Sequence, residues 1–181
     1  SPPGLMIWLK FQAGLALGDQ GRKERNETPP WTPAAKAQID FLFAEDRAGR
    51  PKLILDHCLP HGMPSWMLIT HNAMEILATP GRITMLGEGD GNRMRRIYTD
   101  GRPHPSEYDL HTRSGFTTGR WEGSTLVART THMKAGFLKK IGVPSSDRAT
   151  LTTRFVRHGD ILTVLAVIDD PVYLAEPWLL S

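Results

Sequence analysis

The sequence predicts a mainly β fold, an antiparallel β-barrel of about seven or eight strands with one N-terminal helix. From residue 73 onward, short runs of alternating or β-branched residues are separated by turn signals such as Pro80-Gly81 and Glu122-Gly123. The chain also contains 14 prolines and 17 glycines, which leave little room for a long helical bundle. Because consecutive hairpins form a meander, and closing a meander removes its exposed edges, a barrel or a strongly bent sheet is expected.

One helix is expected over residues 34–45. Thr32 is a suitable N-cap, and Pro33 stands at the first helical position, where a missing backbone N–H costs nothing. The residues that follow are mostly good helix formers, and Gly49 and Pro51 end the helix. An apolar stripe at helical spacing is made by Ile39, Leu42 and Phe43.

The strands are expected where the hydrophobic period changes from 3.6 to 2. Their ranges are residues 73–79, 82–89, 93–99, 115–121, 124–132, 148–157 and 161–168. The last of these is apolar on both faces, so the helix is expected to cover its outer face.

The composition is that of an ordinary globular chain. With 181 residues, 40% of them hydrophobic and 23% charged, the chain suits a single domain over residues 32–181 after an arm and linker over residues 1–31. The single cysteine, Cys58, excludes an intramolecular disulfide framework. No apolar run is long enough to span a membrane. The formal charge of +3 comes from scattered basic residues, which argues against a nucleic-acid partner.

The segment from Leu5 to Leu17 is apolar but is interrupted by Lys10 and Gln12. Its position is that of a signal-sequence remnant, although it lacks a clear basic start and an Ala-x-Ala-like cleavage site. The alternative is an amphipathic arm that packs on its own domain or on a neighbouring copy, which would make the protein a homo-oligomer.

Alternation along the strands places polar side chains in the set expected to face inward. His132 is in phase with the apolar Leu126. On their own strands Arg96, Tyr98 and Glu75 are expected to point the same way. Burying such groups unpaired is costly, so the sequence predicts either a polar network at the barrel mouth or an apolar pocket with a few convergent polar groups.

His104 stands between Pro103 and Pro105, and the two prolines restrict the backbone that carries its imidazole. A rigidly held imidazole suits a general acid or base. The alternative is a stiff turn whose histidine caps a buried carbonyl. The expected catalytic residues are His132, His104 and Tyr98, and the residues expected to bind the substrate are Arg96, Lys134, Glu75 and Trp66.

His57, Cys58 and His61 lie close together in a proline-rich segment. They would seat a zinc or copper ion if a further ligand came from elsewhere in the fold. One thiol and two histidines are too few for a metal-binding motif, so no metal and no other cofactor is expected. His57 and His61 remain the alternative metal pair.

Two motifs carry a family resemblance. The segments Arg95-Arg96-Ile97-Tyr98-Thr99-Asp100-Gly101-Arg102-Pro103-His104-Pro105 and Gly119-Arg120-Trp121-Glu122-Gly123-Ser124-Thr125-Leu126-Val127 resemble a large family of uncharacterised bacterial proteins, often exported. The resemblance covers residues 50–179 and implies no activity. It implies a periplasmic or extracytoplasmic location, with a cytoplasmic one as the alternative. The expected barrel is also similar in plan to lipocalin-like folds, an analogy of shape that carries no function.

The leading functional hypothesis is an enzyme that acts on a small, partly hydrophobic molecule by cofactor-free acid/base chemistry, as a lyase, isomerase, cyclase or hydratase. His132 or His104 would move the proton, and Tyr98 would donate a hydrogen bond to a developing oxyanion. Arg96 or Lys134 would stabilise that oxyanion. The alternative is a non-catalytic, lipocalin-like carrier in which the same residues only orient a ligand.

Overall fold

The computed structural model describes residues 6–9, 29–50, 62–64, 67, 73–88, 93–139 and 143–180. Within them a nine-stranded sheet dominates, and a short hairpin forms a second sheet. Across the large sheet the strands follow the order β1 (Met6–Leu9), β2 (Met74–Thr79), β3 (Arg82–Gly87), β4 (Arg93–Tyr98), β5 (Phe116–Glu122), β6 (Thr125–Thr131), β9 (Thr150–His158), β10 (Ile161–Asp169) and β11 (Trp178–Leu180). The hairpin consists of β7 (Gly136–Lys139) and β8 (Val143–Ser145).

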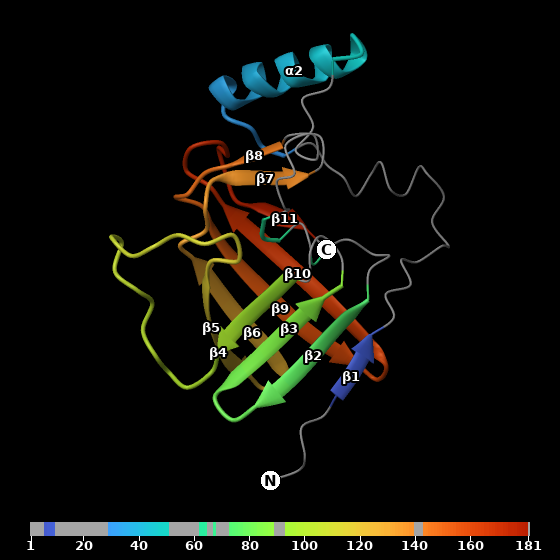
Figure 1. Cartoon of the computed structure of the whole chain (residues 1–181), viewed down its shortest axis with the longest axis vertical. Coiled ribbons are helices and arrows are strands. Elements are labelled where there is room, and N and C mark those ends of the chain that lie inside the picture. The colour runs from blue at the N-terminus through green and yellow to red at the C-terminus, as the bar shows by residue number, and fades with distance from the viewer. Residues whose placement is uncertain are drawn as a thin grey trace.

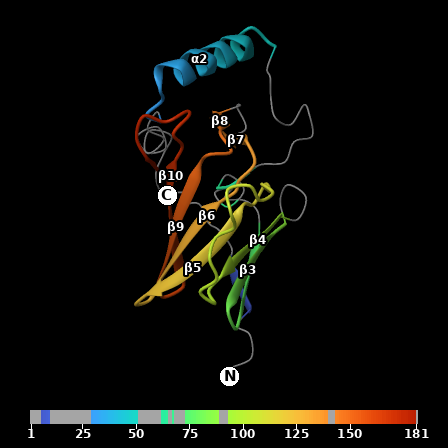
Figure 2. The same ribbon diagram turned by 90° about the vertical axis from the view of Figure 1, so that its left-hand side faces the viewer.

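The large sheet curls into a half-barrel, which confirms the expected mainly β, barrel-like fold with one helix. Figure 1 shows β2, β3 and β4 in front of β9 and β10, and Figure 2 shows β3 and β4 across from β9. The seven strands expected from sequence are all present, with bounds that differ by at most two residues. The expectation missed β1, β7, β8 and β11, which are only three or four residues long and show little alternation.

One step of the expected meander is wrong. Every neighbouring pair in the large sheet is antiparallel except β4 and β5, which are parallel and paired only at Ile97–Thr117 and Tyr98–Thr118. Parallel strands cannot be joined by a tight turn. Residues 99–115 therefore form a long connection, which projects beside β4 and β5 in Figure 1.

The expected helix is confirmed as α2 (Pro33–Arg47). The hydroxyl of Thr32 accepts a hydrogen bond from the backbone N–H of Ala35 (3.3 Å), and Gly49 follows the helix with φ +72°. Figures 1 and 2 show α2 beyond the end of the sheet. The expectation that it covers β10 is therefore wrong, and Ile161 on that strand is 68% exposed.

The start of α2 is held by the segment that follows β10. The backbone N–H of Thr32 donates to the carbonyl of Tyr173 (2.9 Å), and that of Ala175 donates to the carbonyl of Pro30 (2.7 Å). An isolated bridge pairs Trp31 with Leu174, which is buried. The helix is thus attached to the top of the sheet through its first residues.

The first strand, β1, pairs antiparallel with β2, from Met6 opposite Leu77 to Leu9 opposite Met74. This part of the N-terminal arm therefore packs on its own domain, one of the two alternatives expected from sequence. The rest of the arm, from residue 10 to residue 17, lies outside the described residues.

The expected phase of β4 is wrong. Arg95 and Ile97 are fully buried (0% exposed), whereas Arg96 and Met94 are exposed. Alternation itself holds, because Arg95 lies opposite the buried Met85 of β3 and Ile97 lies opposite the buried Ile83. Because Ile97 packs in the core, Arg95, which lies two residues earlier on the same face of β4, is buried as well.

Candidate functional site

A cavity of about 490 Å³ opens on the concave side of the half-barrel. Its wall is formed mainly by apolar side chains from strands on both sides of the curl, among them Ile83, Met85, Ile97, Leu126, Phe155 and Leu162. Polar side chains belong to its turns and strand ends, where Arg157 and Asp160 are exposed. This arrangement resembles a small-molecule site with an apolar wall and a polar rim.

A close approach between two strands shapes one wall of the cavity. A Cβ atom added at Gly119 of β5 would lie 2.6 Å from Cγ2 of Ile97 and 3.3 Å from Cδ1 of Leu126. Only glycine leaves the space that the isoleucine occupies. Trp121, two residues further along β5 and on the same face, lines the cavity with 60% of its surface exposed.

Arg95 lies directly next to the cavity wall, one inward-facing residue further along the strands. Its Nη2 donates to Oγ1 of Thr130 (3.0 Å) and to Oγ1 of Thr153 (3.1 Å), and its Nη1 points at Sδ of Met67 (3.1 Å). Its Cζ lies 5.6 Å from the ring centroid of Phe155, which lines the cavity. The Nε atom of Arg95 has no hydrogen-bond partner in the described part of the chain.

Burial lowers the pKa of Arg95 to about 9, from an ordinary value of 12.5. The guanidinium therefore still carries its charge at neutral pH. Ion pairs within the described residues involve other arginines and Lys36, so Arg95 has no carboxylate partner there. Sequence reasoning missed this residue, although its shared parity with Ile97 was a signal that it faces inward.

The two histidines expected to be catalytic lie on the opposite, convex side of the sheet. Thr117 and Thr130 are buried on the concave side, so Thr118 and Thr131 face the other way. His104 contacts both of these outward hydroxyls, Thr118 through Nε2 (2.8 Å) and Thr131 through Nδ1 (2.9 Å). Neither His104 nor His132 lines the cavity.

His132 joins the same chain of hydrogen bonds. Its Nδ1 lies 2.8 Å from Oγ1 of Thr131, and its Nε2 donates to the carbonyl of Ser106 (2.6 Å). Its φ of +56° ends the alternation of β6 and turns its ring away from the concave side. The expectation that His132 stays in phase with Leu126 and points inward is therefore wrong.

When both histidines are neutral, the donor and acceptor capacities of the groups fix the direction of each hydrogen bond in this series. Since a carbonyl only accepts, Nε2 of His132 carries a proton and its Nδ1 accepts from the hydroxyl of Thr131. That hydroxyl has one proton, so Thr131 must accept from Nδ1 of His104, whose Nε2 accepts from Thr118. All the hydrogen bonds of the series therefore point in the same direction. Thr118 donates to His104, His104 donates to Thr131, and Thr131 donates to His132.

Several charged groups surround His104. Partial burial, the charge of Arg129 and the charge of His132 together lower the pKa of the His104 imidazole below 6.5. The ring of His111 lies 5.1 Å from that of His132, and its Nδ1 donates to the carbonyl of Met133 (3.0 Å). Threonine hydroxyls and backbone carbonyls therefore brace the histidine cluster. The described partners of His104 itself are two hydroxyls, and not the buried carbonyl of the alternative expected from sequence.

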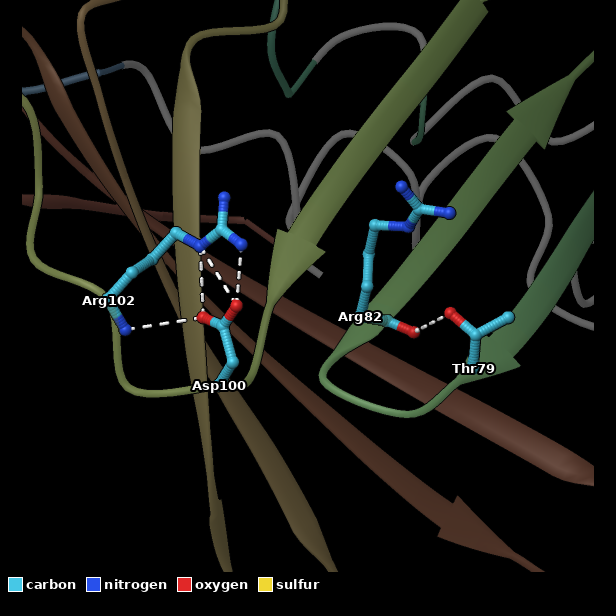
Figure 3. A network of polar contacts seen from close by, with 4 residues as sticks. All are labelled: Thr79, Arg82, Asp100 and Arg102. Atoms are coloured by element: carbon cyan, nitrogen blue, oxygen red, sulfur yellow. Dashed lines mark hydrogen bonds and ion pairs between the residues drawn. The ribbon is translucent and has the colours of Figure 1, made fainter.

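Tyr98 also lies on the convex side. Its ring stacks on Phe116 with centroids 5.2 Å apart, and the guanidinium of Arg102 lies 3.9 Å from its centroid. Figure 3 shows Arg102 folded back onto Asp100, with Nη2 donating to Oδ2 (2.6 Å) and Nε to both oxygens (3.0 Å). These bonds hold the pKa of Asp100 below its usual range and fix the turn that leads into the 99–115 connection.

The other residues expected to bind substrate are dispersed. Arg96 and Lys134 are exposed and lie away from the cavity wall. Glu75 is half-buried on the face of β2 opposite to Ile76, which lines the cavity. Trp66, His57, Cys58 and His61 lie outside the described residues.

The described residues contain no group of three or more histidine, cysteine or acidic side chains placed to hold a metal ion. In the same part of the chain, no helix has the length and apolar character needed to cross a membrane.

Comparison of the chain with protein-family models, with curated proteins and with solved structures finds no match. The resemblance of its two motifs to exported bacterial proteins therefore stays a prediction.

Proposed function

We propose that this protein binds a small hydrophobic molecule in the concave face of its half-barrel. The observation that supports the proposal is the cavity of about 490 Å³ with its mainly apolar wall. This volume falls in the range of roughly 300–1,000 Å³ that is usual for ligand pockets.

Exposed apolar side chains at the mouth of the cavity favour the binding of a ligand. Trp121 and Ile161 line it and are 60% and 68% exposed. Large apolar side chains exposed together around a hollow mark a surface that another apolar group covers. A ligand seated there would remove apolar surface from water on both sides of the curl, which is a favourable free-energy change.

Binding fits the geometry better than acid/base catalysis in the same cavity. His104 and His132 lie on the convex side, so a substrate in the cavity would not meet them. Among the described residues, the ionisable groups that line the cavity are Arg157 and Asp160 at its rim. The enzyme hypothesis is therefore the alternative, and it predicts chemical change in a bound compound.

The first test is a fluorescence titration with Nile red, a neutral hydrophobic dye. The double variant Trp121→Ser/Ile161→Ser removes two exposed side chains at the mouth and is expected to weaken dye binding about tenfold or more. The matched control, Val172→Ser/Leu179→Ser, removes two exposed apolar side chains that do not line the cavity. Equal loss in the two double variants, or no loss in the first, contradicts the proposal.

Native mass spectrometry of the purified protein separates binding from catalysis. A compound retained by the protein is extracted, identified, returned to the protein and recovered. The proposal expects recovery without chemical change. Recovery of a product, lost in His104→Ala or His132→Ala, would instead support the enzyme hypothesis.

A further inference from the structure

Within the part of the chain that the structure describes, a buried positive charge without an acidic partner lies inside the half-barrel. Arg95 is fully buried, and its described hydrogen-bond partners are the hydroxyls of Thr130 and Thr153 and the sulfur of Met67, all uncharged. Its Nε is left without a partner in the part of the chain that the structure describes. Burying a charge is expensive unless an opposite charge accompanies it.

The guanidinium lies next to the cavity along the strand direction. The pair Leu126–Phe155 of β6 and β9 lines the cavity, and Ala128–Thr153 is the next inward-facing pair of the same two strands. Arg95 bonds to Thr153 of that second pair. Two residues along a strand correspond to about 7 Å, so the guanidinium lies in the row of side chains directly next to the apolar wall.

Residues that line the cavity also flank Arg95 on its own strand and on the neighbouring strand. Ile97, the next inward residue of β4, and Met85, its partner on β3, both line the cavity. The guanidinium is close enough to Phe155 for a cation–π contact. The cavity therefore has an apolar body, and the buried guanidinium of Arg95 lies directly behind the side chains that line its inner end.

We propose that the natural ligand is a hydrophobic molecule with a single carboxylate, and that Arg95 binds this carboxylate at the inner end of the cavity. The inference rests on the proposed function and adds the chemical class of the ligand. A guanidinium presents parallel N–H donors that match the two oxygens of a carboxylate. The carboxylate would give Arg95 the negative partner that its described surroundings lack, and the tail would fill the apolar body.

The test compares two ligands that share a tail and differ in charge, dodecanoate and 1-dodecanol, in competition with Nile red at neutral pH. Wild-type protein is expected to bind dodecanoate about tenfold or more tightly than the alcohol. Equal affinities overturn the carboxylate inference and leave the hydrophobic cavity standing. Failure of both ligands and of the dye to bind overturns the proposed function itself.

Substitution assigns the preference to one residue. Arg95→Met is expected to abolish the preference for dodecanoate and to leave the affinity for 1-dodecanol within about twofold, which also shows that the variant is folded. Arg95→Lys keeps the charge and is expected to retain part of the preference. The matched control is Arg96→Met, which removes the adjacent, exposed arginine of the same strand. Loss of the preference in Arg96→Met but not in Arg95→Met contradicts the assignment.

A measurement on unaltered protein covers the case in which Arg95→Met does not fold. In ¹⁵N spectra of arginine side chains, dodecanoate is expected to shift the Nε resonance of one slowly exchanging, buried arginine, and 1-dodecanol is expected to leave it in place. Identical spectra with the two ligands would overturn the inference.

Discussion

Arg95 and Arg96 are neighbours in the sequence and occupy opposite environments. Arg95 is fully buried among threonine hydroxyls and methionine sulfur, and Arg96 is exposed. Because adjacent strand residues face opposite sides, only one of them can reach the interior. Arg95 shares a face with Ile97 and is therefore the one that is buried. Its burial places a positive charge in the interior, and the proposed ligand would neutralise that charge.

His104 carries a prediction about pH. Its folded-state pKa is lowered, first by burial and then by Arg129 and His132, so the unfolded chain binds a proton more readily than the folded one. The stability associated with neutral His104 is therefore fully present above 6.5 and is lost as pH falls through the lowered pKa. Between about pH 7 and pH 5, His104→Gln is expected to lose less free energy of unfolding than wild type does.

Urea unfolding at a series of pH values measures this difference. The control is His158→Gln, which replaces an exposed histidine at the end of β9 far from Thr131. His111 and the other charges near the cluster are unchanged in both variants. If His104→Gln and His158→Gln follow the same pH dependence as wild type, the assignment of this sensitivity to His104 is wrong.

At the scale of elements, one buried carboxylate connects three parts of the molecule. Asp170 is 1% exposed and follows β10 directly. It accepts hydrogen bonds from the backbone and the hydroxyl of Ser146 (both 2.7 Å), just after β8, and from the backbone of Val172 (3.0 Å). The turn that it shapes holds the start of α2 through the bond from Thr32 to the carbonyl of Tyr173. The helix therefore depends on a side chain outside its own sequence.

Asp170→Ala is expected to lower the free energy of unfolding by about 3 kcal/mol, because it leaves several buried donors without an acceptor. Urea denaturation followed by far-UV circular dichroism measures the loss. The matched control is Asp169→Ala, which removes the adjacent, exposed carboxylate and is expected to change stability by no more than about 0.5 kcal/mol. Similar losses in the two variants would contradict this role for Asp170.

At the scale of the whole molecule, the sheet contains a narrow junction. Strands β4 and β5 pair only at Ile97–Thr117 and Tyr98–Thr118, whereas β5 and β6 pair along the whole of β5. The strands on the β1–β4 side and those on the β5–β11 side are thus joined through few backbone hydrogen bonds. The cavity wall takes side chains from both, so a ligand would contact each side of the junction.

Hydrogen exchange measured by mass spectrometry is expected to show this division. Amides of β6, β9 and β10, in the long antiparallel part of the sheet, should exchange more slowly than those of β2 and β3. A bound hydrophobic ligand should slow exchange mainly in β2, β3 and β4. Uniform protection across the sheet, or ligand protection confined to β9 and β10, is the contrary result.

The sequence by itself determined the local elements. Thr32 and Pro33 begin the helix and Gly49 follows it, and the turns at Gly81 and Gly159 have positive φ angles of +73° and +59° where hairpins were expected. These features depend on interactions within a few residues, such as a cap or a glycine turn, so they can be recognised in the chain alone. The short strands β7, β8 and β11 were not predicted, because they contain too few residues to show a recognisable alternation.

Only the tertiary structure decided which side of each strand is inside. The phase of β4 depends on how it pairs with β3, and the parallel step to β5 depends on the path of residues 99–115; both join segments far apart in the chain. His104 and Tyr98 thereby came to lie on the convex side, and Arg95 came to lie beside the cavity. The physical reason is that alternation divides a strand into two faces, whereas packing against distant strands selects the face that is buried.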